Sequence, residues 1–157
     1  MDASKIKELI KQQKKELFSG SFARIKDAEP GEPVPMLNAD GEQTHWFTPF
    51  NLNRRTAGFS IQNLAGKMII YGLLTPNAGI KEKIDPGFFL TPPALILDEI
   101  KKSYPGFEIL SQSFSYDESP QRWGWRINMA KQSQRLTLFV APDGWYEKRE
   151  KKLGWEG

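Results

Sequence analysis

The sequence has no cysteine, one histidine, and no long hydrophobic run. Without cysteine the chain has no disulfide scaffold, no thiol nucleophile and no cysteine-based zinc or iron–sulfur site. The single histidine, His45, excludes any site that needs two. The longest apolar run, residues 68–74, is too short for a membrane-spanning helix, which needs about 20 residues. We therefore expect no membrane span, no metal and no cofactor.

The excess of one charge sign is also small, because the chain has 22 basic and 19 acidic side chains and a net charge of +3. Such a balance creates no strong single-sign field. The 157 residues, 39% of them hydrophobic, suit a single folded domain spanning 1–157. The lysine-rich start has no apolar segment of the signal-peptide type after it. We expect a soluble protein of the cytoplasm.

The chain begins with a predicted amphipathic helix that ends at Gly20. Ser4 is the favoured N-cap and Asp2 is its rival. Gln13 interrupts an apolar face that comprises Ile6, Leu9, Ile10, Leu17 and Phe18. Prolines and glycines then predict an irregular segment over residues 21–43.

Alternating side chains predict six strands, at 44–50, 55–62, 67–74, 107–116, 123–130 and 135–141. Trp145 and Tyr146 are candidates for one more short strand. A second helix is predicted over residues 91–104, with Thr91 as N-cap and Pro92 at the first helical position. A loop, residues 75–90, precedes it. The predicted fold class is α+β, with two helices packed on an antiparallel sheet.

The two halves of the chain, residues 1–74 and 91–148, share the order helix and then strands. A constant offset matches Trp46 with Phe114 and places the run Ala57, Phe59 and Ile61 against Trp125, Ile127 and Met129. Almost no residues are identical between the halves. Two explanations stay open, a duplication of α-β-β(-β) units or a chance similarity between hairpins.

The second half carries a likeness to a known family. Its predicted helix, 91–104, leads into Phe107-Glu108-Ile109 and the strand 125–129, and then into a strand that ends in Pro142-Asp143-Gly144. This order resembles the tandem units of PepSY-like domains and of β-lactamase-inhibitor-like proteins. The resemblance implies a helix on an antiparallel sheet. It also implies a protein that binds or inhibits other proteins.

The residues that enzymes use are poorly represented. No Gly-x-Ser-x-Gly nucleophile elbow and no phosphate-binding glycine loop occurs, and His45 is interpreted as a structural or surface residue. The carboxylate pairs Asp98-Glu99 and Asp117-Glu118 are interpreted as solvated charges, as is the charged segment 147–152. We expect a protein that is not an enzyme.

Three functions are ranked on this basis. The first is a protein-binding module, an inhibitor, adaptor or assembly factor, that binds another protein or itself through a sheet edge, the two long loops and aromatic residues. The candidate aromatic anchors are Phe88, Phe89, Trp145 and Trp155. The alternative is a nucleic-acid-binding sheet face that carries Arg54, Arg55, Arg122, Arg126 and Arg135. A small-ligand pocket or an enzyme ranks third.

Overall fold

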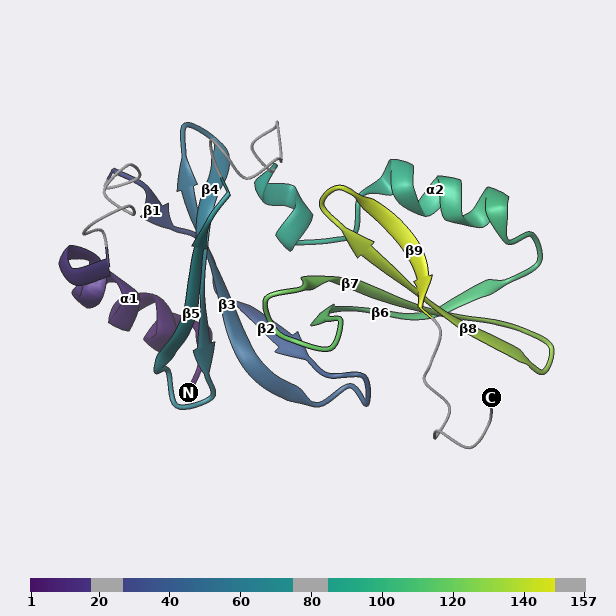
Figure 1. Cartoon of the computed structure of the whole chain (residues 1–157), viewed down its shortest axis with the longest axis horizontal. Coiled ribbons are helices and arrows are strands. Elements are labelled where there is room, and N and C mark those ends of the chain that lie inside the picture. Colours follow the sequence, from purple (N-terminus) through teal and green to yellow (C-terminus); the bar gives the residue numbers. More distant parts are fainter. Residues whose placement is uncertain (18–26, 75–84, 149–157) are drawn as a thin grey trace. The chain divides into compact units, whose positions relative to one another are not determined.

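The computed structural model describes residues 1–17, 27–74 and 85–148 (Figure 1). These residues form two α-helices and nine strands, which confirms an α+β fold dominated by antiparallel sheet. The chain divides into two compact units, Met1–Thr91 and Pro92–Gly157.

The first unit consists of helix α1 and five strands. The helix spans Ala3–Leu17, and the strands are β1 (Glu29–Pro30), β2 (Val34–Leu37), β3 (Gln43–Leu52), β4 (Arg55–Asn63) and β5 (Met68–Leu73). Its strands lie in the order β5-β4-β3-β2, β1 also pairs with β3, and all these pairs are antiparallel. A short 3₁₀ helix, Pro86–Phe89, lies near the C-terminal end of this unit.

Helix α1 is capped by Asp2, so the prediction of Ser4 was wrong and its rival was right. The Asp2 carboxylate accepts the backbone N–H of Lys5 at 2.9 Å, which satisfies one of the donors that a helix start leaves free. Ile6 and Ile10 of the predicted apolar face are buried in one cluster with Trp46 and Phe50 of β3. The predicted stop at Gly20 lies outside the described residues.

A polar row lies inside the first unit on the α1 side of β3 and β4. Thr48 donates to the Gln62 side-chain oxygen at 3.1 Å, and the Gln62 amide donates to Ser60 at 2.5 Å. All three side chains are fully buried. Because the row satisfies its own hydrogen bonds, it is tolerated beneath the helix.

The predicted alternation of β4 is interrupted at Ala57. Phe59 and Ile61 share a face with Phe47 on β3, as the register of the two strands requires. A register shift between Phe50 and Asn51 leaves Ala57 without a direct partner on β3, and Ala57 packs in the α1 cluster instead. A bulge of this kind transfers a side chain to the other face of the sheet.

The segment 21–43, predicted to be irregular, contains strands β1 and β2. Its prolines hide this pattern, because proline gives no N–H to a ladder and favours edge positions. Pro35 lies opposite Trp46 and is exposed. Both strands pair with the long strand β3, and this pairing holds them extended although the local sequence does not predict strands here.

The second unit consists of helix α2 (Ala94–Ser103) and four strands. They are β6 (Glu108–Tyr116), β7 (Trp123–Lys131), β8 (Gln134–Ala141) and β9 (Gly144–Lys148), joined in sequence order by antiparallel pairing. Helix α2 begins at Ala94, so the predicted start at Thr91 and Pro92 was wrong. The physical reason is the Pro92-Pro93 pair, since a residue that precedes proline is pushed out of the helical region.

Helix α2 lies toward one face of the second sheet. Tyr104 lies at its C-terminal end, and the ring centroids of Tyr104 and Trp145 are 6.1 Å apart. The Tyr104 hydroxyl donates to the Glu147 carboxylate at 3.1 Å. Trp145 and Glu147 alternate with Tyr146 and Lys148 along β9. The second pair therefore belongs to the opposite face, where polar side chains predominate.

The registers of the two units differ. In the first unit Trp46 pairs with Gln62, whereas Phe114, its counterpart by the constant offset, pairs with Trp125. The same offset carries Gln62 to Ala130, not to Trp125. The order of elements agrees between the units, but the pairing of β3 with β4 does not carry over to β6 with β7.

Candidate functional site

Strand β5 forms one edge of the first sheet. It pairs with β4 from Gly58 opposite Leu73 to Gln62 opposite Met68, and within the described residues no strand pairs with its outer edge. The strand contains neither charge nor proline. Ile69 is 46% exposed and Tyr71 is 56% exposed. An apolar edge of this kind is a template for a further strand.

The pairing of β5 is irregular at Ile69. The register shifts between Ile61 and Gln62 of β4, and Ile69 is the β5 residue that the shift leaves without a partner. Gly72, further along the strand, leaves room for the ring of Phe59, which a Cβ at this position would meet at 2.8 Å. The strand is therefore packed against the Phe59 ring at Gly72, whereas Ile69 is exposed to solvent.

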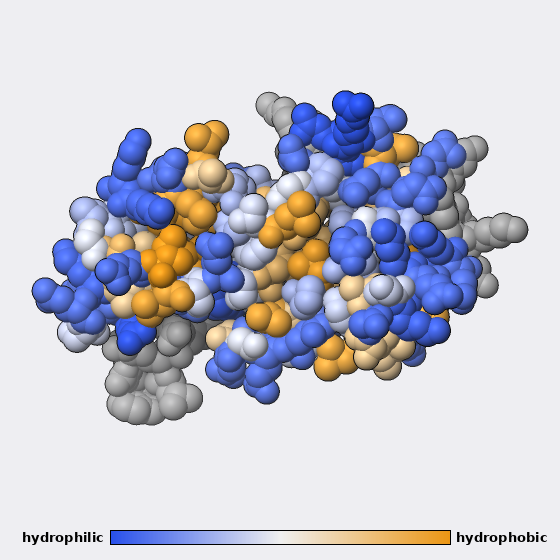
Figure 2. Space-filling view, turned by 180° about the vertical axis from the view of Figure 1, so that it is seen from behind, coloured by the Kyte–Doolittle hydropathy of each residue, from blue (hydrophilic) through white to orange (hydrophobic). Residues whose placement is uncertain are grey.

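Strand β9, which pairs with β8 in the second unit, has a different composition. It carries Glu147 and Lys148 within five residues. Charged side chains on an edge strand oppose pairing with another chain. The described strands thus include a charged edge at β9 and an apolar edge at β5. Figure 2 shows hydrophobic residues in several separate groups on a largely hydrophilic face.

The predicted aromatic anchors occupy different surroundings. Phe88 and Phe89 are buried, and the Phe89 ring stacks on Phe47 at 5.1 Å between centroids. They fill the interior of the first unit. Trp145 is half-buried against Tyr104, and Trp155 lies outside the described residues. Sequence reasoning did not include Ile69, although the neutral run 68–74 was a signal for it.

The five arginines of the nucleic-acid alternative are divided between the two units. Arg54 and Arg55 lie at the β3–β4 turn, whereas the other three belong to the second unit. Arg126 is buried and donates to the Ser115 hydroxyl at 3.3 Å and to the Tyr116 carbonyl at 3.0 Å. A guanidinium held in this way serves the sheet and is not directed at a phosphate.

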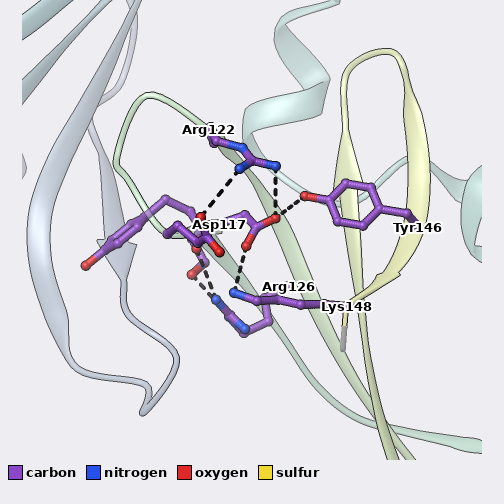
Figure 3. A network of polar contacts seen from close by, with 8 residues as sticks. Asp117, Arg122, Arg126, Tyr146 and Lys148 are labelled. Atoms are coloured by element: carbon purple, nitrogen blue, oxygen red, sulfur yellow. Dashed lines mark hydrogen bonds and ion pairs between the residues drawn. The ribbon is translucent and has the colours of Figure 1, made fainter. Parts of the chain in front are cut away.

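Asp117 is the centre of a polar network at the end of β6 (Figure 3). Its carboxylate contacts Lys148 at 2.7 Å and Arg122 at 3.4 Å, and it accepts the Tyr146 hydroxyl in a short hydrogen bond. The Asp117 side chain is 7% exposed. The prediction that Asp117 is a solvated charge was wrong, while its neighbour Glu118 is exposed as predicted.

The network joins the β6–β7 connection to the edge strand β9. Tyr146 and Lys148 are two residues apart, so they share a face of β9 and reach the same carboxylate. This spacing was visible in the sequence, but the carboxylate that they meet lies 29 residues from Tyr146. Lys148 also belonged to a segment predicted to be solvated, and its side chain is only 21% exposed.

The network shifts the pKa values of its members. Burial acts to raise the pKa of Asp117, but hydrogen bonds from Lys148 and Tyr146 and the positive charges of Lys148 and Arg122 outweigh it and hold this pKa below its ordinary value of 3.8. Burial and the hydrogen bond to Asp117 raise the pKa of Tyr146 to about 12. At neutral pH the carboxylate is therefore ionised and the phenol is neutral, which is the arrangement that the hydrogen bond requires.

His45, on β3, lies beside the hydroxyl of its neighbour in the chain. Its Nδ1 lies 2.8 Å from the hydroxyl of the preceding residue, Thr44, and burial lowers its pKa from 6.5. Among the described residues no group of three or more histidine, aspartate or glutamate side chains is placed to hold a metal ion. In the part of the chain that the structure describes, neither helix has the length and hydrophobicity of a membrane span.

Comparisons with models of protein families, with curated proteins and with solved structures find no match for this chain. The functional assignment therefore rests on the sequence and on the geometry of the two units.

Proposed function

We propose that the chain is a non-enzymatic protein-binding module, and that its partner adds an extended segment to the outer edge of β5. The observation that carries this proposal is the apolar, proline-free edge at β5 with Ile69 exposed. In strand addition, backbone hydrogen bonds supply affinity and alternate side chains supply specificity. The partner is a protein with an extended apolar segment.

The contrast between the two edge strands supports this choice. Natural sheets block unwanted pairing with charges, prolines or very short edge strands. The β9 edge has such charges in Glu147 and Lys148, whereas the six residues of β5 have none. The β5 edge, left open in a chain that places charges on β9, is best explained by pairing with a partner.

The polar groups in the interior support a non-enzymatic role. Thr48, Ser60 and Gln62 bond to one another beneath α1, and Asp117 holds the end of β9. Each network has a structural task. The resemblance of the second half to PepSY-like units, which bind or inhibit proteins, points the same way.

The duplication of the two halves stays a prediction. The order of one helix followed by an antiparallel series of strands supports it, with β3 to β5 corresponding to β6 to β8. The differing registers at Trp46 and Phe114 weigh against the alignment by a constant offset. A duplication would thus have to allow for slippage between strands.

A peptide selection tests the proposed edge pairing. Extended peptides selected on the immobilised wild-type chain should bind it, and Ile69→Lys should weaken that binding at least tenfold because the new charge lies on the pairing edge. Leu95→Lys is the matched control, since Leu95 is an 83% exposed leucine on α2. Hydrogen exchange should slow at β5 amides when peptide is bound. Equal binding by Ile69→Lys, or protection confined to other strands, would contradict the proposal.

A further inference from the structure

An open groove lies on strands β6 to β8 of the second unit, apart from the β5 edge. Its volume is about 350 Å³. It is lined by Leu110, Ser111, Asn128, Met129, Arg135, Leu136 and Thr137. This volume falls at the lower end of the range for small-molecule sites, roughly 300–1,000 Å³.

The floor of the groove is a hydrogen-bonded row across three strands. Ser111 lies opposite Asn128, and Asn128 lies opposite Thr137. The Asn128 amide donates to the Ser111 hydroxyl at 2.9 Å, and Thr137 donates to the Asn128 carbonyl oxygen at 2.9 Å. These bonds fix the three side chains before any ligand arrives, which lowers the entropic cost of binding.

The row leaves hydrogen-bond donors available. The Ser111 oxygen accepts from Asn128, so its own hydrogen remains free to donate, and the Asn128 amide has a second N–H. Arg135 is the charged residue of the lining and is exposed. Within the described residues the structure gives Arg135 no ion pair. A guanidinium and two further donors without a carboxylate among the lining residues favour an anion.

A β-bulge gives the groove an apolar side. The register of β6 and β7 shifts between Ile109 and Ser111, and the extra residue, Leu110, is 51% exposed. Bulges often redirect a side chain beside a functional site. The groove thus combines a cationic end and donors with exposed aliphatic surface.

We propose that this groove binds a small organic anion, a carboxylate on a short aliphatic chain. The carboxylate pairs with the Arg135 guanidinium and accepts from Ser111 or Asn128. The aliphatic chain lies against Leu110. This site is independent of β5, so it stands or falls separately from the proposed protein binding.

An NMR titration of the full chain with hexanoate tests the site, with hexylamine and hexanol as probes of equal length and different charge. Hexanoate should produce saturable shifts in the backbone amides of Ser111, Asn128 and Thr137 and in the Arg135 side chain, with a Kd in the millimolar range. Hexylamine should bind at least tenfold more weakly, because its charge is repelled by Arg135. Hexanol should also bind at least tenfold more weakly, because it lacks the charge.

Two variants assign the binding energy. Arg135→Gln should weaken hexanoate binding at least tenfold, and Ser111→Ala should weaken it severalfold. Arg55→Gln, an exposed arginine of the first unit, is the matched control and should leave the affinity unchanged. Amide spectra away from the groove show whether each variant is folded. The proposal is overturned if hexanoate gives no saturable shift, if hexanol or hexylamine binds equally well, or if folded Arg135→Gln keeps the wild-type affinity.

Discussion

The substitution Asp117→Asn isolates the contribution of one buried charge. Asparagine keeps the shape of the side chain and an oxygen that accepts the Tyr146 hydroxyl, but it removes the charge that Lys148 and Arg122 contact. The two cations differ in exposure, since the Lys148 side chain is 21% exposed and that of Arg122 is 58% exposed. Most of the loss should therefore arise from Lys148.

The magnitude follows from these exposures. A hydrogen bond to a charged group contributes about 1.5–3 kcal/mol when solvent is largely excluded, and an exposed ion pair contributes about 0–1 kcal/mol. The lower end of the first range for Lys148 and the middle of the second for Arg122 add to about 2 kcal/mol. We expect Asp117→Asn to lower the free energy of unfolding at pH 7 by about this amount, as measured by urea denaturation.

The pH dependence separates charge from packing. The pKa of Asp117 is lowered by folding, so its stabilising effect is complete above the ordinary value of 3.8 and is lost as the pH falls through the lower pKa of the folded state. The difference between wild type and Asp117→Asn should therefore shrink in acid. Asp98→Asn, an exposed aspartate of α2, is the control and should change stability by less than about 0.5 kcal/mol. Wild-type stability of Asp117→Asn at pH 7, or a difference that persists unchanged at low pH, would refute the reasoning.

Three further predictions concern packing and hydrogen bonding. The Gln13 side-chain oxygen is buried without a hydrogen-bond partner among the described residues, so Gln13→Leu should raise the free energy of unfolding by about 1 kcal/mol in urea denaturation; a loss of stability would show that the oxygen is satisfied. A Cβ on Gly124 would collide with the Val140 carbonyl oxygen, so Gly124→Ala should cost about 2 kcal/mol by the same assay, and a cost below about 0.5 kcal/mol would contradict that packing. Tyr146 stabilises the fold in its neutral form, complete below pH 10 and lost as the pH rises toward its pKa of about 12. Tyr146→Phe should remove this loss from an alkaline titration of stability, and an unchanged alkaline profile would argue against the hydrogen bond to Asp117.

Local pattern was sufficient for most elements of the fold. Alternating residue types located β4 and β7 to within a residue, because successive side chains of a strand point to opposite faces of the sheet. The turn at Asn63 was equally legible, since its side chain accepts the N–H groups of Ala65 and Lys67. Where the pattern failed, proline was the usual reason, as in β2 and at the start of α2.

The candidate sites were less accessible from the sequence. The neutral run 68–74 was visible, but only the strand order shows that β5 is an edge, and only the pairing shows that Ile69 lies at a register shift. Phe88 and Phe89 were predicted as binding anchors, but both are buried, and Phe89 stacks on Phe47 in the interior of the first unit. Pairing partners of this kind are set by the whole sheet and not by nearest neighbours.

The absence of cysteine and the single histidine determined by themselves that this chain has no disulfide, no thiol chemistry and no site of two imidazoles. Periodicity determined its α+β class. Only the tertiary structure brought Asp117 to Tyr146 and Lys148, and only the register of three strands aligned Ser111, Asn128 and Thr137. The physical reason is that composition and period are local properties of the chain. Hydrogen-bonded sites depend instead on contacts between residues far apart in sequence, which exist once the strands have paired.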